Sequence, residues 1–136
     1  MRELLLALMT WIAGQTGLAM PPPPSVVLIS EEEIAKIAAG HEGADVRGLY
    51  DRDVAIIYLR NDWNPDDLRS RASLLHELVH HAQTFNKVPS RCPAEREVQA
   101  YRLTVQWLKE QGAADPYAVL DIDEFTIHVL SMCPES

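Results

Sequence analysis

The sequence predicts a single α+β domain, built from a small β-sheet and several helices. The chain has 136 residues, of which 47% are hydrophobic and 24% are charged, which is typical of one globular domain with one core. Short β-branched runs lie in the first half of the sequence, and longer segments with helical periodicity dominate the second half. We therefore expect residues 1–136 to form one domain.

Residues 1–19 have two interpretations. A basic residue near the start, an apolar stretch and a small-residue end outline a signal peptide. Glu3 offsets the charge of Arg2, however, and apolar residues at helical spacing describe an amphipathic first helix: Leu4, Leu5, Leu8, Met9 and Ile12. Such a helix would end near Gly17, and the prolines of residues 20–24 would form a stiff extended spacer.

The segment after the spacer predicts a strand, a helix and a β-hairpin. The β-branched run at residues 25–29 indicates a strand. Ser30, with Glu33 three residues later, indicates the start of a helix that ends at Gly40. Two further β-type runs, from Val46 to Tyr50 and from Val54 to Leu59, flank a short polar loop and predict the hairpin.

Three helices are expected in the second half. Asn64 can cap a helix and Pro65 suits its first turn, so a long helix should begin there and end near Gln83 or Phe85. The next helix should begin at Pro93 and end before Gly112. The last is expected at residues 116–132.

The long helix contains an HExxH pattern, His76-Glu77-Leu78-Val79-His80. Two histidines four residues apart are separated by about 6 Å along a helix and project from one face, so both imidazoles can reach one Zn²⁺. Glu77 lies at the edge of that face, where its carboxylate can accept a proton from a metal-bound water without ligating the metal. The alternative is a solvent-facing polar stripe that binds no metal.

A zinc site needs a third protein ligand, and the following helix offers Glu95 and Glu97. These two residues cannot share a helix face, because they are two positions apart. If Ala100 and Leu103 face inward, Glu97 lies on the same face and Glu95 does not. The periodicity therefore favours Glu97.

The segments HELVHHAQ and EREVQAY, together with the strand IIYL, resemble the gluzincin class of zinc peptidases. The resemblance extends from about Leu49 to Leu108 and is greatest to minigluzincins and small bacterial zincin-like proteins. It implies a zincin-like fold, and a peptide substrate bound by strand addition along the run from Val54 to Leu59. It also implies Glu77 as general base and zinc ligated by three residues: His76, His80 and Glu97.

Three more residues are candidates for a supporting role around the metal. His81 points about 100° away from His80 around the helix, which favours a structural or supporting role. Tyr101 stands where many gluzincins have Asp or Asn to support a ligand histidine. His128 lies among apolar residues of the last helix, either as a core or rim histidine or as a donor to a substrate oxyanion.

Cys92 and Cys133 are the two cysteines of the chain. A disulfide between them is expected if the protein is exported, whereas a reducing cytosol would keep both as thiols. With the leader-like N-terminus, the pair favours an exported or periplasmic location over the cytoplasm.

The leading functional hypothesis is zinc-dependent hydrolysis of peptide bonds, with Glu77 removing a proton from water and delivering it to the leaving amine. A zinc-bearing binding or structural module without turnover is the alternative, because a domain this small has little room for a second cleft wall. A third interpretation is that no metal binds.

Several other classes are excluded by the composition. The net charge of −8 and the pI near 5.0 argue against a nucleic-acid partner. No apolar run approaches the roughly 20 residues of a membrane-spanning helix, so no membrane span is expected. The oligomeric state stays open.

Overall fold

The computed structural model describes residues 1–39 and 47–134. These residues form six helices and one three-stranded mixed sheet, so the expected α+β class is confirmed. The elements are, in chain order, α1 (Arg2–Thr16), β1 (Ser25–Ile29), α2 (Glu31–Ala38), β2 (Gly48–Asp51), β3 (Ile56–Arg60), α3 (Leu68–Phe85), α4 (Pro93–Glu110), α5 (Pro116–Leu120) and α6 (Glu124–Leu130).

β3 is the central strand of the sheet, in the order β1-β3-β2. It pairs in parallel with β1 and in antiparallel with β2, which confirms the predicted hairpin. β3 begins at Ile56 rather than at Val54, because Ala55 is in the left-handed region (φ 55°) and closes the hairpin turn. The expected beginning of β2, Val46, and the expected end of α2, Gly40, lie outside the described residues.

The central position of β3 contradicts the prediction that a peptide adds to the run from Val54 to Leu59. Strand addition requires an unpaired edge of backbone donors and acceptors. β3 has β1 on one side and β2 on the other, so the sheet itself uses both of its edges. Among the described residues, β2 is the edge strand of the hairpin.

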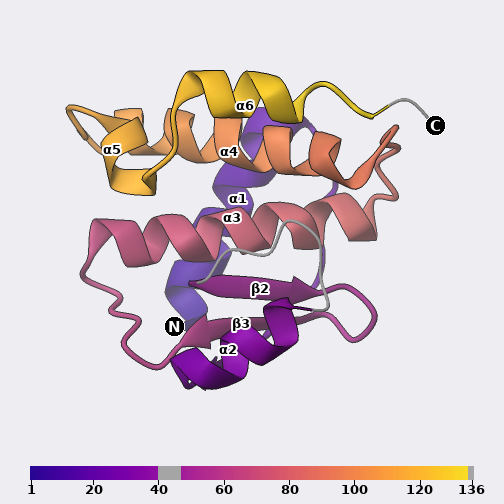
Figure 1. Ribbon diagram of the computed structural model, residues 1–136. Helices are drawn as coiled ribbons and strands as arrows, with labels where there is room; N and C mark the ends of the chain where they lie inside the picture. Colours follow the sequence, from indigo (N-terminus) through magenta and orange to yellow (C-terminus); the bar gives the residue numbers. More distant parts are fainter. Residues whose placement is uncertain (40–46, 135–136) are drawn as a thin grey trace.

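α3 lies between the sheet and α4 (Figure 1). Alternation along β3 buries Ile57 and Leu59, and the face of α3 toward the core is apolar and buried. α1 packs on α3 through the apolar face that the sequence predicts. Four residues of that face are buried in the same core: Leu5, Leu8, Met9 and Ile12. α3 is therefore in contact with the core on several sides, which fixes the orientation of its polar face.

Two helix boundaries differ from the sequence prediction. α3 begins at Leu68 rather than near Pro65, because Asp67 is the residue whose side chain caps it, accepting from the backbone N–H of Ser70. The expected helix over residues 116–132 is two helices, α5 and α6. Asp121 adopts a left-handed conformation (φ 55°) that ends α5, and Asp123 caps α6 by accepting from the N–H of Thr126.

The segment between α1 and β1 is held against α3. α1 ends at Gly17 with φ 73°, a conformation that glycine adopts without the penalty of a Cβ. Ala19 exchanges two hydrogen bonds with the side chain of Asn86, and the ring of His81 bonds to the carbonyl of Pro22. No helix within the described residues is long and apolar enough to cross a membrane.

Candidate metal centre

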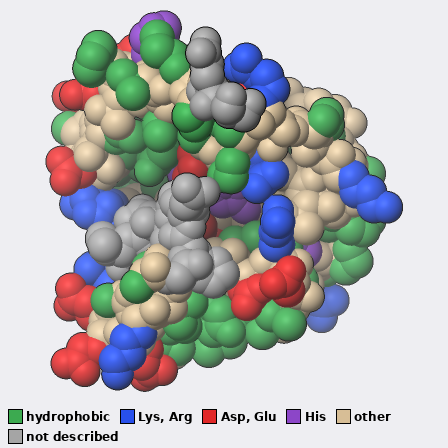
Figure 2. All heavy atoms as spheres, turned by 45° about the vertical axis from the view of Figure 1, so that its right-hand side comes forward, with side chains coloured by type: hydrophobic (Ala, Val, Ile, Leu, Met, Phe, Trp, Pro, Cys, Tyr) green, Lys and Arg blue, Asp and Glu red, His purple; other side chains and the backbone are tan. Residues whose placement is uncertain are grey.

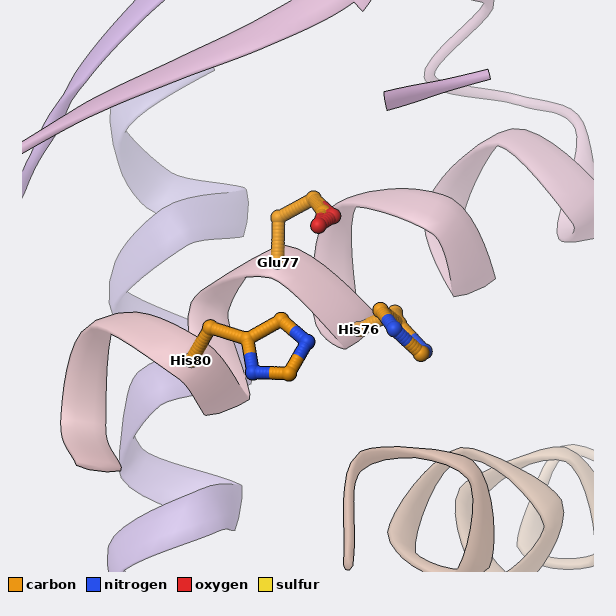
Figure 3. Close-up of side chains that lie close together, drawn as sticks. All are labelled: His76, Glu77 and His80. Carbon is orange, nitrogen blue, oxygen red and sulfur yellow. The ribbon is translucent and has the colours of Figure 1, made fainter. Parts of the chain in front are cut away.

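His76 and His80 project from α3 toward Glu97 of α4. Glu97 Oε2 lies 3.0 Å from His76 Nε2, and Glu97 Oε1 lies 2.7 Å from His80 Nε2. Figure 3 shows the His76, Glu77 and His80 side chains extending into the same space beside α3. The structure thus brings together the three residues expected as metal ligands and the expected base.

The alternative third ligand, Glu95, points elsewhere. Its carboxylate accepts a hydrogen bond from Arg91 Nε at 2.7 Å. Ala100 is fully buried between α3 and α4, as the periodicity argument required. The small side chain lets the two helices approach closely, so Glu97 on the same face reaches the histidines.

Glu77 is buried beside the two histidines. Its side chain lies against β2, where a Cβ added to Gly48 would be 3.3 Å from Glu77 Cγ. The ligand atoms of His76, Glu77 and His80 all lie within 4.8 Å of one another. This geometry allows Glu77 to act as a base beside a metal ion or as one of its ligands.

The electrostatics of the cluster are dominated by the ion pair between Glu97 and the histidines. Burial alone would raise the pKa of Glu97, but the close contacts with His76 and His80 and their positive charge lower it to about 2. Burial alone would lower the pKa of His80, but Glu97, Glu77 and Gln83 raise it to about 9. Each group therefore stabilises the charged form of the other.

Gln83 orients the ring of His80. Its amide nitrogen donates to Arg96 O at 3.1 Å and to Gln99 Oε1 at 2.7 Å, so its oxygen is left to accept from His80 Nδ1 at 2.8 Å. A proton held on Nδ1 leaves the Nε2 lone pair of His80 for a metal. Sequence reasoning missed this residue, although its position three after His80 on a helix indicates the contact.

The donor set fits a zinc ion. Two imidazole nitrogens and one carboxylate oxygen are the protein ligands of one group of catalytic zinc sites. His80 Nε2 is buried and makes no hydrogen bond of acceptable geometry, although Glu97 Oε1 is only 2.7 Å away. The Nε2–H direction of His80 therefore does not point at Glu97 Oε1. This is expected when Nε2 and Oε1 are both directed at a common point that lies beside them.

A space-filling view shows histidine side chains at the bottom of a hollow in one face of the molecule, with basic side chains beside it (Figure 2). His76 and Glu97 expose only 6% and 13% of their side chains, and His80 13%. The three side chains of the cluster are thus largely sheltered from solvent.

Comparison with known proteins gives one match. A family described as "Domain of unknown function (DUF6647)" matches residues 1–135. The chain belongs to this family. No curated protein and no solved structure matches the chain. The region shared with the DUF6647 family includes α1, the HExxH helix and the Glu97 helix.

The three supporting candidates in this DUF6647 chain occupy different environments. Tyr101 packs edge-on against His76, with ring centroids 4.7 Å apart, so it contacts the cluster. His81 donates from Nε2 to Pro22 O at 2.7 Å and accepts at Nδ1 from Tyr50 O–H at 2.8 Å, so its role is structural. His128 is exposed on α6, so of its expected positions the core is wrong and the rim stays open.

His128 is exposed because α6 is a short helix that buries only Ile127. The apolar residues expected to surround the histidine, Phe125, Val129 and Met132, expose 74%, 47% and 61% of their surface. The segment is helical, as its periodicity predicts. The face of α6 that packs on α4, however, is the one centred on Ile127 and not the one that carries His128.

The expected disulfide of the DUF6647 chain is present between Cys92 and Cys133, with a Cα–Cα distance of 5.8 Å. It joins the N-cap of α4 to the segment after α6. The bond therefore fixes the beginning of the helix that carries Glu97.

Proposed function

We propose that the protein is a zinc-dependent peptidase of the gluzincin type. The observation that carries the proposal is the convergence of two histidines of α3 and a glutamate of a different helix beside a second buried glutamate. A surface polar stripe would not need a carboxylate from α4 at 2.7 and 3.0 Å from the two imidazoles.

The proposed chemistry divides between the ion and the chain. Zinc, held by His76, His80 and Glu97, would supply a Lewis acid that polarises a carbonyl and makes water more acidic. Glu77 would accept a proton from the attacking water at its carboxylate oxygen and later deliver it to the leaving amine nitrogen. Gln83 and Tyr101 would hold the His80 and His76 rings in the orientation that ligation requires.

The position of β2 supports a substrate path next to the cluster. Gly48, the first residue of β2, has Glu77 Cγ within 3.3 Å of where a Cβ would be. An extended peptide lying along this strand would pass directly by the base. We therefore propose β2, rather than the central strand, as the backbone that aligns the substrate.

The proposal is tested by zinc content and turnover together. Wild-type protein should hold about one zinc per chain, and His76→Ala, His80→Ala or Glu97→Ala should each lose most of it. Glu77→Gln should keep the zinc but lose cleavage of a broad peptide library, because the amide cannot accept the proton. Glu95→Gln, two residues from Glu97 and bound to Arg91 instead, is the matched control and should keep both properties.

The results separate three interpretations. Zinc loss in Glu77→Gln as severe as in His76→Ala would make Glu77 a ligand and refute the mechanism. Zinc binding without any turnover in wild type would favour a binding module. Absence of zinc from wild type after loading would refute both.

We also infer that the protein works in an oxidising compartment, exported or periplasmic. The support is the disulfide between Cys92 and Cys133, since such bonds rarely persist in a reducing cytosol. Thiol titration of denatured, unreduced protein should then find no free cysteine. Two free thiols in protein taken from an oxidising compartment would refute the inference.

A further inference from the structure

A second polar pocket lies along α3 on the N-terminal side of the cluster. It has a volume of about 360 Å³ and is lined by residues of the β3–α3 connection, the first turns of α3, and Arg47 before β2. Three arginines (Arg47, Arg60 and Arg69) and two aspartates (Asp62 and Asp67) line it, in a chain whose net charge is −8. The excess of arginines over carboxylates at this place is opposite in sign to the overall charge and suits an anionic ligand.

The pocket and the metal cluster share one face of α3. Arg69 precedes His76 by seven residues, and Ser73 precedes His80 by seven, so each pair is nearly aligned along the helix. The distance along the axis from Arg69 to His76 is about 10 Å at 1.5 Å per residue. Arg47 also links the pocket to the metal cluster. It lines the pocket and directly precedes Gly48, whose backbone lies against Glu77.

Among the arginines of this pocket, Arg69 has a buried Nε that the fold leaves without a hydrogen-bond partner. Arg60 binds Asp62 through two hydrogen bonds, at 3.2 and 3.1 Å, and Asp67 is engaged in capping α3. Arg69 Nε is buried and has no hydrogen-bond partner, and none of the ion pairs among the described residues includes Arg69. A buried guanidinium nitrogen without a partner is unfavourable unless a ligand supplies the acceptor.

We propose that this pocket binds a carboxylate of the peptide substrate, with Arg69 as the residue that determines specificity. The proposal rests on the proposed peptidase function and adds the substrate class to it. An extended peptide advances about 3.3 Å per residue, so about 10 Å places the carboxylate two or three residues from the scissile bond. The guanidinium fork matches a carboxylate in geometry as well as in charge. The carboxylate belongs either to an Asp or Glu side chain or to a free C-terminus.

The test measures binding separately from turnover, so that failure of the two proposals can be distinguished. Zinc-loaded Glu77→Gln protein is titrated with two pairs of peptides, followed by calorimetry and by the Arg69 Nε–H signal in NMR. One pair differs by Glu against Gln within an N- and C-blocked pentapeptide, and the other by a free against an amidated C-terminus. We expect the acidic member of one pair to bind at least about tenfold more tightly and to shift the Arg69 signal, and that pair identifies the source of the carboxylate.

The preference should disappear when Arg69→Gln is added and persist when Arg102→Gln is added. Arg102 is a suitable control because it is exposed on α4 and paired with Glu124. Arg69→Lys keeps the positive charge but not the forked geometry of the guanidinium, so it should retain part of the preference for the acidic peptide. This variant provides the test if Arg69→Gln does not fold. Wild-type kcat/KM for the two pairs should show the same ranking.

Equal affinity for the acidic and neutral members of both pairs would overturn the proposal, as would a preference that survives Arg69→Gln. An acidic preference measured in the binding experiment, in a protein that cleaves no peptide, would sustain the pocket and refute only the peptidase function.

Discussion

At Gly48 the sheet and the HExxH helix lie close together. A Cβ at this position would lie 3.2 Å from Leu59 Cδ2 and 3.3 Å from Glu77 Cγ, so a larger residue must displace one of them. Leu59 is fully buried in the core and cannot move easily. Displacement therefore falls mainly on Glu77, the proposed base.

We expect Gly48→Ala to lower peptide turnover by about tenfold while zinc content stays unchanged, because a shift of a few tenths of an ångström misaligns a proton acceptor. Turnover and bound zinc are measured on the same sample. Gly14→Ala is the control, since a Cβ there meets nothing within 4 Å. Unchanged turnover in Gly48→Ala would show that Glu77 does not need this position.

At the scale of single residues, the sequence predicted the cluster better than its surroundings. The HExxH spacing and the periodicity around Ala100 were sufficient for His76, Glu77, His80 and Glu97, because both depend only on helix geometry. Gln83 and Gly48 were not found, because their roles depend on contacts between elements. His128 was misplaced for the same reason: periodicity defines a face but not which face packs.

Among the elements, α1 is the one through which the two interpretations of residues 1–19 can be tested. Leu8 and Ile12 expose only 3% and 2% of their surface, and both belong to the core around α3. If these residues are a permanent part of the fold, Leu8→Ala should lower the free energy of unfolding by about 2 to 4 kcal/mol through lost burial and a cavity. Urea denaturation measures the change, and the exposed Leu6 gives the control, Leu6→Ala.

A destabilisation by Leu8→Ala no larger than that of Leu6→Ala would indicate that α1 does not contribute to the stable domain. Mass spectrometry of the same protein, recovered from the compartment in which it accumulates, would then be expected to find residues 1–19 removed.

The disulfide between Cys92 and Cys133 links the beginning of α4 covalently to the segment that follows α6. It closes a sequence separation of 41 residues, which restricts the unfolded chain by about 4 kcal/mol in the loop-entropy description. We expect the Cys92→Ser/Cys133→Ser double variant to unfold at lower urea concentration, by up to that free energy. Because Cys92 is the N-cap of α4, zinc affinity should fall as well, and a double variant with wild-type stability and affinity would contradict this role.

For the whole molecule, stability after removal of metal with a chelator should depend on pH through the His–Glu97 cluster. The pKa of Glu97 is lowered to about 2, so its contribution is complete above its ordinary pKa of 4.5 and is lost as pH falls toward 2. The pKa of His80 is raised to about 9, so its contribution is complete below 6.5 and is lost as pH rises toward 9. Stability from this cluster should therefore be greatest between about pH 4.5 and 6.5.

Urea midpoints measured from pH 4 to 9 check this expectation, with the His80→Gln/Glu97→Gln double variant as the reference. The difference between the two proteins should be largest in that window and decrease on both sides. A difference that grows from pH 6.5 to 9 would contradict the ion pair.

The fold as a whole was predictable in its elements but not in its sheet order. Caps, prolines and periodicity gave most helices and strands within a few residues, because these are local properties, but they did not separate α5 from α6. The order β1-β3-β2 depends on a parallel pairing between segments separated by α2 and β2, which no local pattern encodes. For this reason the strand expected to bind substrate was in fact the central one.

The hydrogen bonds of His81 connect three segments that are distant in the sequence. Its partners, Pro22 and Tyr50, are 59 and 31 residues away, and Glu97 is 21 residues from His76. Contacts of this kind form only after long stretches of chain have been closed into loops, which is entropically unfavourable and slow. We therefore expect the contacts of His81 to form late in folding, because they need the hairpin and the N-terminal segment to be docked on α3. Protection of the His81 ring would then report that these three segments have reached their native arrangement.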